Sequence, residues 1–250
     1  MRLPFKIVSR ARWRGLREES RDSRDSRLLL QRLRERFDAE GAEPKLLRSD
    51  LLRAIAATEP AAILDIGANV GTWSRSLSER FPSSVVHAVE ADPRTCALLR
   101  ERVGGSARIV VHNLAMHAHG GKVTLHSHAN NLLSSLLALA DAEGATTAVE
   151  VDATTLDDFV RTQMPTCPTV IKIDTEGNDR NVLDGGRQTL ADARLKALVM
   201  EFGFDPEDRR HVEIRRLVEF LLPFGLLVHE IDLAGVDDGR LYGNVLFGRA

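Results

Sequence analysis

The stretch that most constrains the fold of this chain is AAILDIGANVGTWS, residues 61–74. Its apolar start predicts a short buried strand, its glycines predict a tight turn, and its end predicts the beginning of a helix. In α/β folds, a strand, a glycine-rich turn and a helix in this order present backbone N–H groups to a ligand. Asp65 stands at the carboxyl end of the strand, and Gly67 and Gly71 are predicted to let the backbone approach a ligand where a Cβ would collide. No lysine follows in the pattern of a P-loop, which excludes a phosphate-cradling loop.

A second predicted strand, VVHAVEAD at residues 85–92, carries an acid near its end. Glu90 follows Gly71 by about 20 positions, the separation at which such folds hydrogen-bond a ribose hydroxyl. A carboxylate there suits a nucleoside with free hydroxyls and repels a phosphate. The turn and the acid together indicate a nucleoside cofactor site, with a purely structural corner as the alternative. Because an acid precedes the glycines, we expect a cofactor with a cationic amino acid end rather than a pyrophosphate.

The rest of the chain predicts one α/β domain. With 250 residues, 43% of them hydrophobic, the chain can bury a single core and carry a short appendage. Predicted strands alternate with predicted helices, which indicates a doubly wound, mainly parallel, Rossmann-like sheet. The last two apolar segments predict an antiparallel strand pair at the C-terminal end. Further strands are predicted at residues 107–116, 122–128, 169–177 and 195–204.

Composition excludes several classes of function and partner. The formal net charge of -2 provides no global basic field, so nucleic acid is not expected as a partner. Cys96 and Cys167 form no C-x-x-C motif, and we expect free thiols in a reducing cytoplasm. No apolar run approaches the length of a membrane-spanning helix, and the N-terminus does not have the pattern of a secretory signal. We therefore predict a cytoplasmic protein without a transmembrane span.

Residues 1–44 differ from residues 45–250, which we predict to form the domain. The first segment is rich in arginine and mixed in charge, and Leu29, Leu33 and Phe37 can line one face of a helix. This predicts a helical N-terminal extension that packs on the domain or on a second subunit of a homodimer. Two alternatives are a peripheral contact with a membrane or an acidic partner, and disorder.

Several motifs together resemble those of FkbM-type methyltransferases. LDIGANVG, VEADP, HNLAM, SSL, TTLDDF, KIDTEGNDRNVLDGG and YGNVLF occur in the order shown by that family, over residues 45–250. The resemblance implies a class I methyltransferase fold and transfer of a methyl group from S-adenosylmethionine to a hydroxyl. The acceptors it implies are small hydroxylated molecules: sugars, glycolipids or polyketide-like secondary metabolites. The cofactor-binding residues it implies are Asp65, Gly67, Asn69, Gly71, Glu90, Ala91, Asn113 and Ala115.

Two of these residues also have a purely structural interpretation. Asn113 can hydrogen-bond the adenine or merely close a turn. Asn69 lies within the glycine turn, where either the methionine end of the cofactor or local turn bonding would explain it.

The fourth main strand contains the predicted catalytic residues. In the sequence IKID, Lys172 and Asp174 point to the same side because side chains alternate along a strand. Asp174 falls at the carboxyl end, where a carboxylate that accepts the proton of an acceptor hydroxyl contributes about 10²–10⁴-fold to the rate. Alternatively, Asp174 caps the next helix or pairs with Lys172. Glu201, at the end of the fifth strand, is predicted to face the substrate or to support the base.

Metal dependence is a second hypothesis for the same place. Asp174, Glu176 and Glu201 can converge as hard oxygen ligands of Mg²⁺, which would acidify the acceptor hydroxyl. Without a metal, Glu176 is predicted to face the substrate.

Serines and histidines supply weaker candidates. Ser134 and Ser135, in the SSL segment, are predicted to line the acceptor pocket or to cap a helix. His211 is a candidate general base near the substrate. His126 and His128 share one strand face at a spacing that a transition metal could use.

Two other function classes compete with an O-methyltransferase. One is a nucleoside-binding partner subunit without methyl transfer, against which the intact motif residues argue. The other is an RNA or protein methyltransferase. IDTE stands where amino-methylating enzymes carry an NPPY-like tetrapeptide, so oxygen is the favoured acceptor atom.

Overall fold

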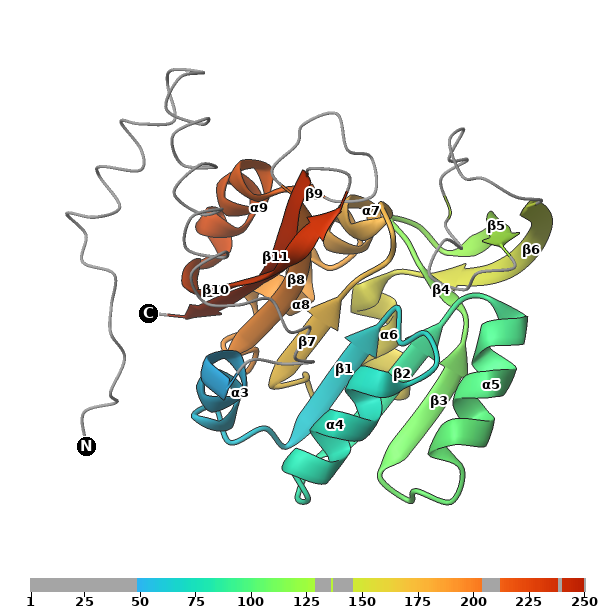
Figure 1. Ribbon diagram of the computed structural model, residues 1–250, viewed down its shortest axis with the longest axis horizontal. Helices are drawn as coiled ribbons and strands as arrows, with labels where there is room; N and C mark the ends of the chain where they lie inside the picture. Colours follow the sequence, from blue (N-terminus) through green and yellow to red (C-terminus); the bar gives the residue numbers. More distant parts are fainter. Residues whose placement is uncertain (1–48, 129–135, 137–145, 204–211, 238–239, 250) are drawn as a thin grey trace.

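A mainly parallel sheet lies at the centre of the computed structural model, with helices on both of its faces (Figure 1). The structure describes residues 49–128, 136, 146–203, 212–237 and 240–249. The predicted extension at residues 1–44 lies outside these ranges, as do Ser134, Ser135 and His211.

The main sheet combines parallel strands with a C-terminal antiparallel pair, as the sequence predicted. Its parallel strands are β1 (Ala62–Ile66), β2 (Val85–Glu90), β3 (Ile109–Asn113), β7 (Val170–Ile173), β8 (Ala197–Gly203) and β9 (Val212–Glu213). β11 (Arg240–Arg249) pairs antiparallel with β8, and β10 (Leu226–Asp237) pairs antiparallel with β11. The order is β10-β11-β8-β7-β1-β2-β3, with β9 beside β8. The order reverses between β1 and β7, and open α/β sheets bind ligands at such a point.

Helices cover both faces of this sheet, which explains why its parallel strands are nearly continuous apolar runs. On one face lie α3 (Ser49–Ala56), α4 (Thr72–Arg80) and α5 (Pro93–Val103) (Figure 1). On the other lie α6 (Leu156–Gln163), α7 (Asp179–Asp184), α8 (Arg187–Ala191), α9 (Ile214–Leu221) and the short η2 (Leu222–Phe224). Ile63 and Val170 pack with α3 and α4, whereas Leu64 and Ile171 pack with α6 to α9, as strand alternation requires.

A second, three-stranded sheet has the order β4-β6-β5, with β4 (Ala115–Met116), β5 (Gly121–His128) and β6 (Thr146–Thr154). The extra strand predicted at residues 122–128 is confirmed as β5. The strand predicted at residues 107–116 is confirmed as β3, but its predicted end is wrong, because β3 ends at Asn113 and β4 pairs with β6. The break follows Asn113, whose side-chain amide donates to the carbonyls of Glu90 at 2.9 Å and Ala91 at 3.1 Å.

A buried polar cluster joins this small sheet to α5. Asp92 caps the helix, since its Oδ1 accepts a hydrogen bond from the backbone N–H of Arg94 at 2.9 Å. Its Oδ2 accepts a hydrogen bond from the hydroxyl of Ser127 on β5, and that hydroxyl accepts one from the Arg94 guanidinium. Asp92 and Ser127 are both buried. The cluster therefore holds β5 against the helix that follows Glu90.

Both cysteines are free, as predicted, and the structure buries both of them. Burial raises the pKa of the Cys167 thiol to about 11 and also raises that of Cys96, so both stay protonated at neutral pH. In the described ranges, no helix has the length and apolar character needed to cross a membrane.

Candidate functional site

The glycine turn links β1 to α4 through three residues with left-handed backbone conformations. Gly67 has φ 76°, Asn69 has φ 51° and Gly71 has φ 84°. A Cβ on Gly67 would lie 1.7 Å from the carbonyl oxygen of Asp174, and one on Gly71 would lie 2.5 Å from Leu99. The space that a Cβ would need at these two glycines is therefore filled by protein atoms, while Gly67 also lines the pocket described below. Both glycines are required by the conformation of the turn and by the close packing of β7 and α5 against it.

Glu90 supports the turn from the end of β2. Its carboxylate accepts backbone N–H groups from Asn69 and from Asp92, each at 2.8 Å. Burial raises the pKa of Glu90 to about 7, against the lowering effect of these two hydrogen bonds. Each carboxylate oxygen has a further lone pair, so Glu90 can still accept hydrogen bonds from ligand hydroxyls.

Three further residues that were predicted to bind the cofactor, Ala91, Asn113 and Ala115, divide into two groups. The amide of Asn113 closes the turn after β2, through the two hydrogen bonds already described. Ala91 and Ala115 line the pocket directly.

Lys172 connects the turn to β7 from a buried position. Its Nζ lies 3.1 Å from Asp174 Oδ2 and 3.4 Å from Asp65 Oδ1, and it donates to the carbonyl of Gly67 at 3.3 Å. Ser74 donates to the other oxygen of Asp65 at 2.6 Å, and Asp65 is fully buried beneath the turn. Burial lowers the pKa of Lys172, but Asp174 and Asp65 together outweigh it, so the net shift is upward and the lysine remains charged. The predicted common orientation of Lys172 and Asp174 is confirmed.

Three carboxylates meet where β7 and β8 end. Asp174, Glu176 and Glu201 each offer one oxygen, and these oxygens lie within 4.8 Å of one another. This is the convergence that the sequence suggested. Glu176 has φ 49°, an unfavourable conformation for a residue other than glycine, and such strain concentrates at functional sites. The turn that follows β7 and contains Glu176 is held by Asp179. The carboxylate of Asp179 accepts hydrogen bonds from both the backbone N–H and the hydroxyl of Thr175.

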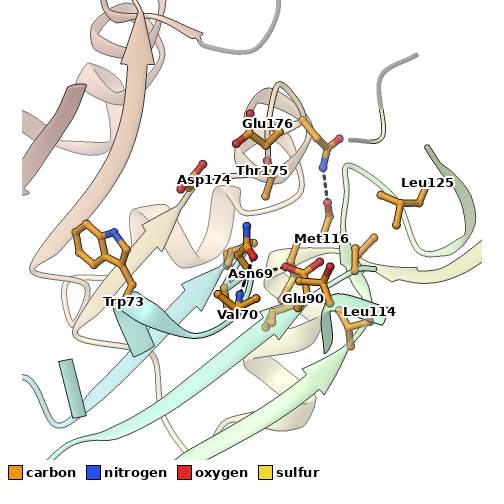
Figure 2. Close-up of a pocket in the computed structure, with 18 of the residues that line it drawn as sticks. Asn69, Val70, Trp73, Glu90, Leu114, Met116, Leu125, Asp174, Thr175 and Glu176 are labelled. Carbon is orange, nitrogen blue, oxygen red and sulfur yellow. Dashed lines mark hydrogen bonds between the residues drawn. The ribbon is translucent and has the colours of Figure 1, made fainter. Parts of the chain in front are cut away.

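Glu90, Lys172, Asp174 and Glu176 help to line a pocket of about 690 Å³ at the point where the strand order reverses (Figure 2). Asp174 and Glu176 lie at one end of it, and Glu90 lies near its middle. The opposite end is apolar and includes Leu114, Met116 and Leu125.

Sequence patterns missed several lining residues. Trp73 lines the pocket, with its ring centre 5.5 Å from the Lys172 ammonium. Leu125 and Leu136 come from the segment that carries the small sheet, whose position no local pattern could give. Trp73 was detectable, since it stands in the first turn after the glycines.

The described histidines lie away from this pocket. His112 stacks on His87 and meets the edge of Phe159 on the opposite face of the sheet. Burial, followed by His87 and Arg100, lowers the pKa of His112 to about 4, so it is neutral. His126 lies on β5 and does not line the pocket, and the side chain of His128 lies outside the described atoms. Among residues that the structure describes, the acidic trio is the group that converges as a metal site would, and the hypothesis of a zinc site at His126 and His128 stays a prediction.

Comparison with known proteins gives consistent results. The family model described as methyltransferase FkbM domain matches residues 65–225. The 2-O-methyltransferase NoeI of Sinorhizobium fredii is 24% identical over 183 residues, which cover 66% of this chain and 72% of that protein. The crystal structure of methyltransferase FkbM from Methylobacillus flagellatus KT is similar with a TM-score of 0.51 and 18% identity. That match covers 76% of this chain and 44% of the other, so the chain spans less than half the length of that relative.

Proposed function

Because the chain belongs to the FkbM methyltransferase family and has the class I methyltransferase fold, we propose that it is an S-adenosylmethionine-dependent O-methyltransferase. Its acceptor is a hydroxyl of a sugar, a glycolipid or a polyketide-like secondary metabolite. The observation that carries this proposal is that Glu90 and Asp174 line one pocket at the reversal of strand order. The relative named as a 2-O-methyltransferase supports oxygen as the acceptor atom.

The pocket fits the cofactor in size and in chemistry. Its volume of about 690 Å³ lies within the range of small-molecule sites. Glu90 would accept hydrogen bonds from the ribose hydroxyls, and Leu114, Met116 and Leu125 would enclose the adenine. The glycine turn and Asn69 would bind the methionine end. When bound, S-adenosylmethionine supplies an electrophilic methyl group.

Asp174 would act on the acceptor hydroxyl. Lys172 contacts its Oδ2, and we assign Oδ1 to accepting the hydroxyl proton as the oxygen begins to bond to the methyl group. Lys172 stays charged and fixes the carboxylate against the turn, since it also binds Asp65 and the carbonyl of Gly67. Proton acceptance of this kind contributes about 10²–10⁴-fold, and alignment of the hydroxyl oxygen contributes further.

Glu176 and Glu201 would bind the acceptor beside Asp174. The same three carboxylates provide the hard oxygen donors that Mg²⁺ prefers, and their convergence within 4.8 Å favours a bound cation as part of the proposal. A cation there would polarise the acceptor hydroxyl. Methyl transfer measured in Mg²⁺ and in EDTA tests this part: equal rates in both would exclude metal and leave the carboxylates as direct ligands of the acceptor.

Calorimetry tests the cofactor assignment. We expect S-adenosylmethionine and S-adenosylhomocysteine to bind the purified chain, and Glu90→Ala to weaken both strongly. Asp174→Asn should bind S-adenosylhomocysteine normally while methyl transfer falls by about 10²–10⁴-fold. Failure of the folded protein to bind either ligand would refute the proposal. Normal binding without transfer to any hydroxylated acceptor would instead support a nucleoside-binding partner subunit.

A further inference from the structure

A pair of histidines lies in the loop between β4 and β5, outside the pocket. The Nδ1 atoms of His117 and His119 are 2.8 Å apart, and the two ring centres are 4.4 Å apart with an angle of 24° between the ring planes. His119 is exposed and His117 is half-buried. Neither residue lines the pocket that would hold the cofactor. The pair is therefore a second cluster of potential ligand atoms, open to solvent and separate from the acidic trio.

Backbone contacts hold this loop in place at His117. The N–H of His117 donates to the carbonyl of Thr154 on β6 at 2.9 Å. The carbonyl of His117 packs so closely on Gly185, at the end of α7, that a Cβ there would lie 2.3 Å from it. A single small residue, Ala118, separates His117 from His119. A ligand that binds both rings therefore finds one of them already fixed, which lowers the cost of ordering the site.

Packing does not account for this pair. Among the described residues, neither imidazole hydrogen-bonds or ion-pairs with any group except the other. The pair formed by His87 and His112 differs, because both of its rings also meet the edge of Phe159. Two Nδ1 atoms at hydrogen-bond distance cannot both carry a hydrogen, so at least one of them presents a lone pair to the gap between the rings.

The spacing of the two nitrogens matches neighbouring positions of a square-planar metal site. Nitrogens bound about 2.0 Å from a metal lie roughly 2.8 Å apart at a right angle and roughly 3.3 Å apart at a tetrahedral angle. The observed distance of 2.8 Å fits the right angle. Square-planar sites with nitrogen ligands are typical of Cu²⁺ and Ni²⁺, and Cu²⁺ binds such ligands more tightly. The carboxylates of the acidic trio suit Mg²⁺ instead, so the two places would select different metals.

We propose that His117 and His119 form a binding site for Cu²⁺, with each imidazole bound through Nδ1 and with water at the remaining positions. Where a ring carries its hydrogen on Nδ1, binding transfers that hydrogen through solvent to Nε2, so neutral rings release no net proton. Copper stays in one oxidation state throughout. The site is independent of the proposed function.

The test titrates Cu²⁺ by calorimetry into the full chain, free of any purification tag, and into three variants. His117→Gln and His119→Gln each remove one ligand, and His126→Gln is a control from the His-x-His pair on β5. We expect the control to match the wild type and each loop variant to bind at least about tenfold more weakly. Copper held elsewhere on the chain is common to all four proteins and cancels in this comparison.

Circular dichroism and thermal unfolding establish that the variants are folded. Because His119 is exposed, His119→Gln alone decides the test if His117→Gln does not fold.

Electron paramagnetic resonance identifies the ligands. The wild type with one equivalent of Cu²⁺ should give an axial spectrum with coupling to two imidazole nitrogens, and His119→Gln should lose at least one of these couplings. The proposal is overturned if a folded loop variant binds Cu²⁺ as tightly as the wild type does, or if the wild-type spectrum shows no imidazole coupling. It is also overturned if His126→Gln weakens binding as much as the loop variants do.

Discussion

Single residues in the turn between β1 and α4 serve the packing of the protein as much as its chemistry. Gly67 leaves room for the Asp174 carbonyl, Asn69 donates to Glu90, and Lys172 joins the turn to β7. Each of these contacts joins the turn to a residue at the end of β2 or at the end of β7 that also lines the pocket. Changes at these positions should therefore affect stability and binding together.

Gly67→Ala should destabilise the protein more than Gly105→Ala does. Both glycines have positive φ, 76° and 83°, so both substitutions carry a backbone cost of about 1–2 kcal/mol. Only at Gly67 would the Cβ collide with backbone, which adds about 1–3 kcal/mol, because nothing lies within 4 Å of a Cβ on Gly105. Urea unfolding of the two variants measures the difference, and equal losses would contradict the packing argument.

Lys172→Met should destabilise the protein by about 3–5 kcal/mol, since it leaves the fully buried Asp65 without its counter-charge. The double variant Asp65→Asn with Lys172→Met should recover most of this loss, because the charge that stays unpaired is then that of the partly exposed Asp174 and not that of a fully buried carboxylate. Chemical denaturation of the single and double variants forms the test. A double variant as unstable as Lys172→Met would mean that lost packing, not charge, accounts for the effect.

The affinity for S-adenosylhomocysteine should depend on pH through Glu90. Burial raises the pKa of this carboxyl to about 7, and ribose hydroxyls are expected to donate to its ionised form. Binding should therefore be strongest above pH 8 and about tenfold weaker at pH 6, where about a tenth of the sites are ionised. Calorimetry across this range provides the measurement, with Glu90→Gln as a control that should bind weakly at every pH.

The Glu90 carboxyl should also make the stability of the unliganded protein depend on pH. This dependence is opposite to that of binding, because stability falls as the pH rises. Because the folded pKa lies above the ordinary value of 4.5, the folded state binds the proton more tightly than the unfolded state. The stabilisation from Glu90 is complete below about pH 4.5 and is lost as the pH rises to about 7. Glu90→Gln should remove this contribution to the pH dependence of unfolding, and an unchanged profile would contradict the raised pKa.

For helices and strands, the sequence predicted the features that local residue patterns determine. Alternating strands and helices, the glycine turn and the late antiparallel pair follow from periodicity and from turn residues. The meeting of Asp174, Glu176 and Glu201 was also expected, because the carboxyl ends of neighbouring parallel strands share one edge. Local residue patterns do not determine the register of the strands or which strands pair. The pairing of β4 with β6, the level of Asn244 beside Glu201 and the place of Leu125 in the pocket depend on contacts between distant segments.

The attachment of the small sheet to α5 gives a test at this scale. Ser127→Ala removes the hydroxyl that Asp92 and Arg94 both contact, and leaves a buried carboxylate oxygen without that donor. We expect a loss of about 1–3 kcal/mol in local stability. Hydrogen exchange should accelerate in β5, β6 and the first turn of α5, and not in β1 or β7. Thr124→Ala, at an exposed position of the same strand, serves as the control.

For the whole molecule, we propose that residues 45–250 form the methyltransferase domain and that residues 1–44 are a separate extension. The described pocket draws its lining from residues 66 to 178. Removal of residues 1–44 should therefore leave the affinity for S-adenosylhomocysteine unchanged within about twofold. Calorimetry on the shortened and full chains makes the comparison, and lost binding by a folded shortened chain would assign the extension to the site.

The bond between Lys172 and the carbonyl of Gly67 joins residues 105 positions apart in the sequence. During synthesis, the turn, α4 and β2 all emerge from the ribosome long before β7 does. Until then Asp65 has no lysine to pair with, and Gly67 lacks the end of β7 that packs against it. The first half of the chain thus contains the most recognisable motif of the protein but cannot complete it. Cofactor affinity should appear late and all at once, when β7 inserts beside β1, and a nascent chain stalled before Lys172 should not show it.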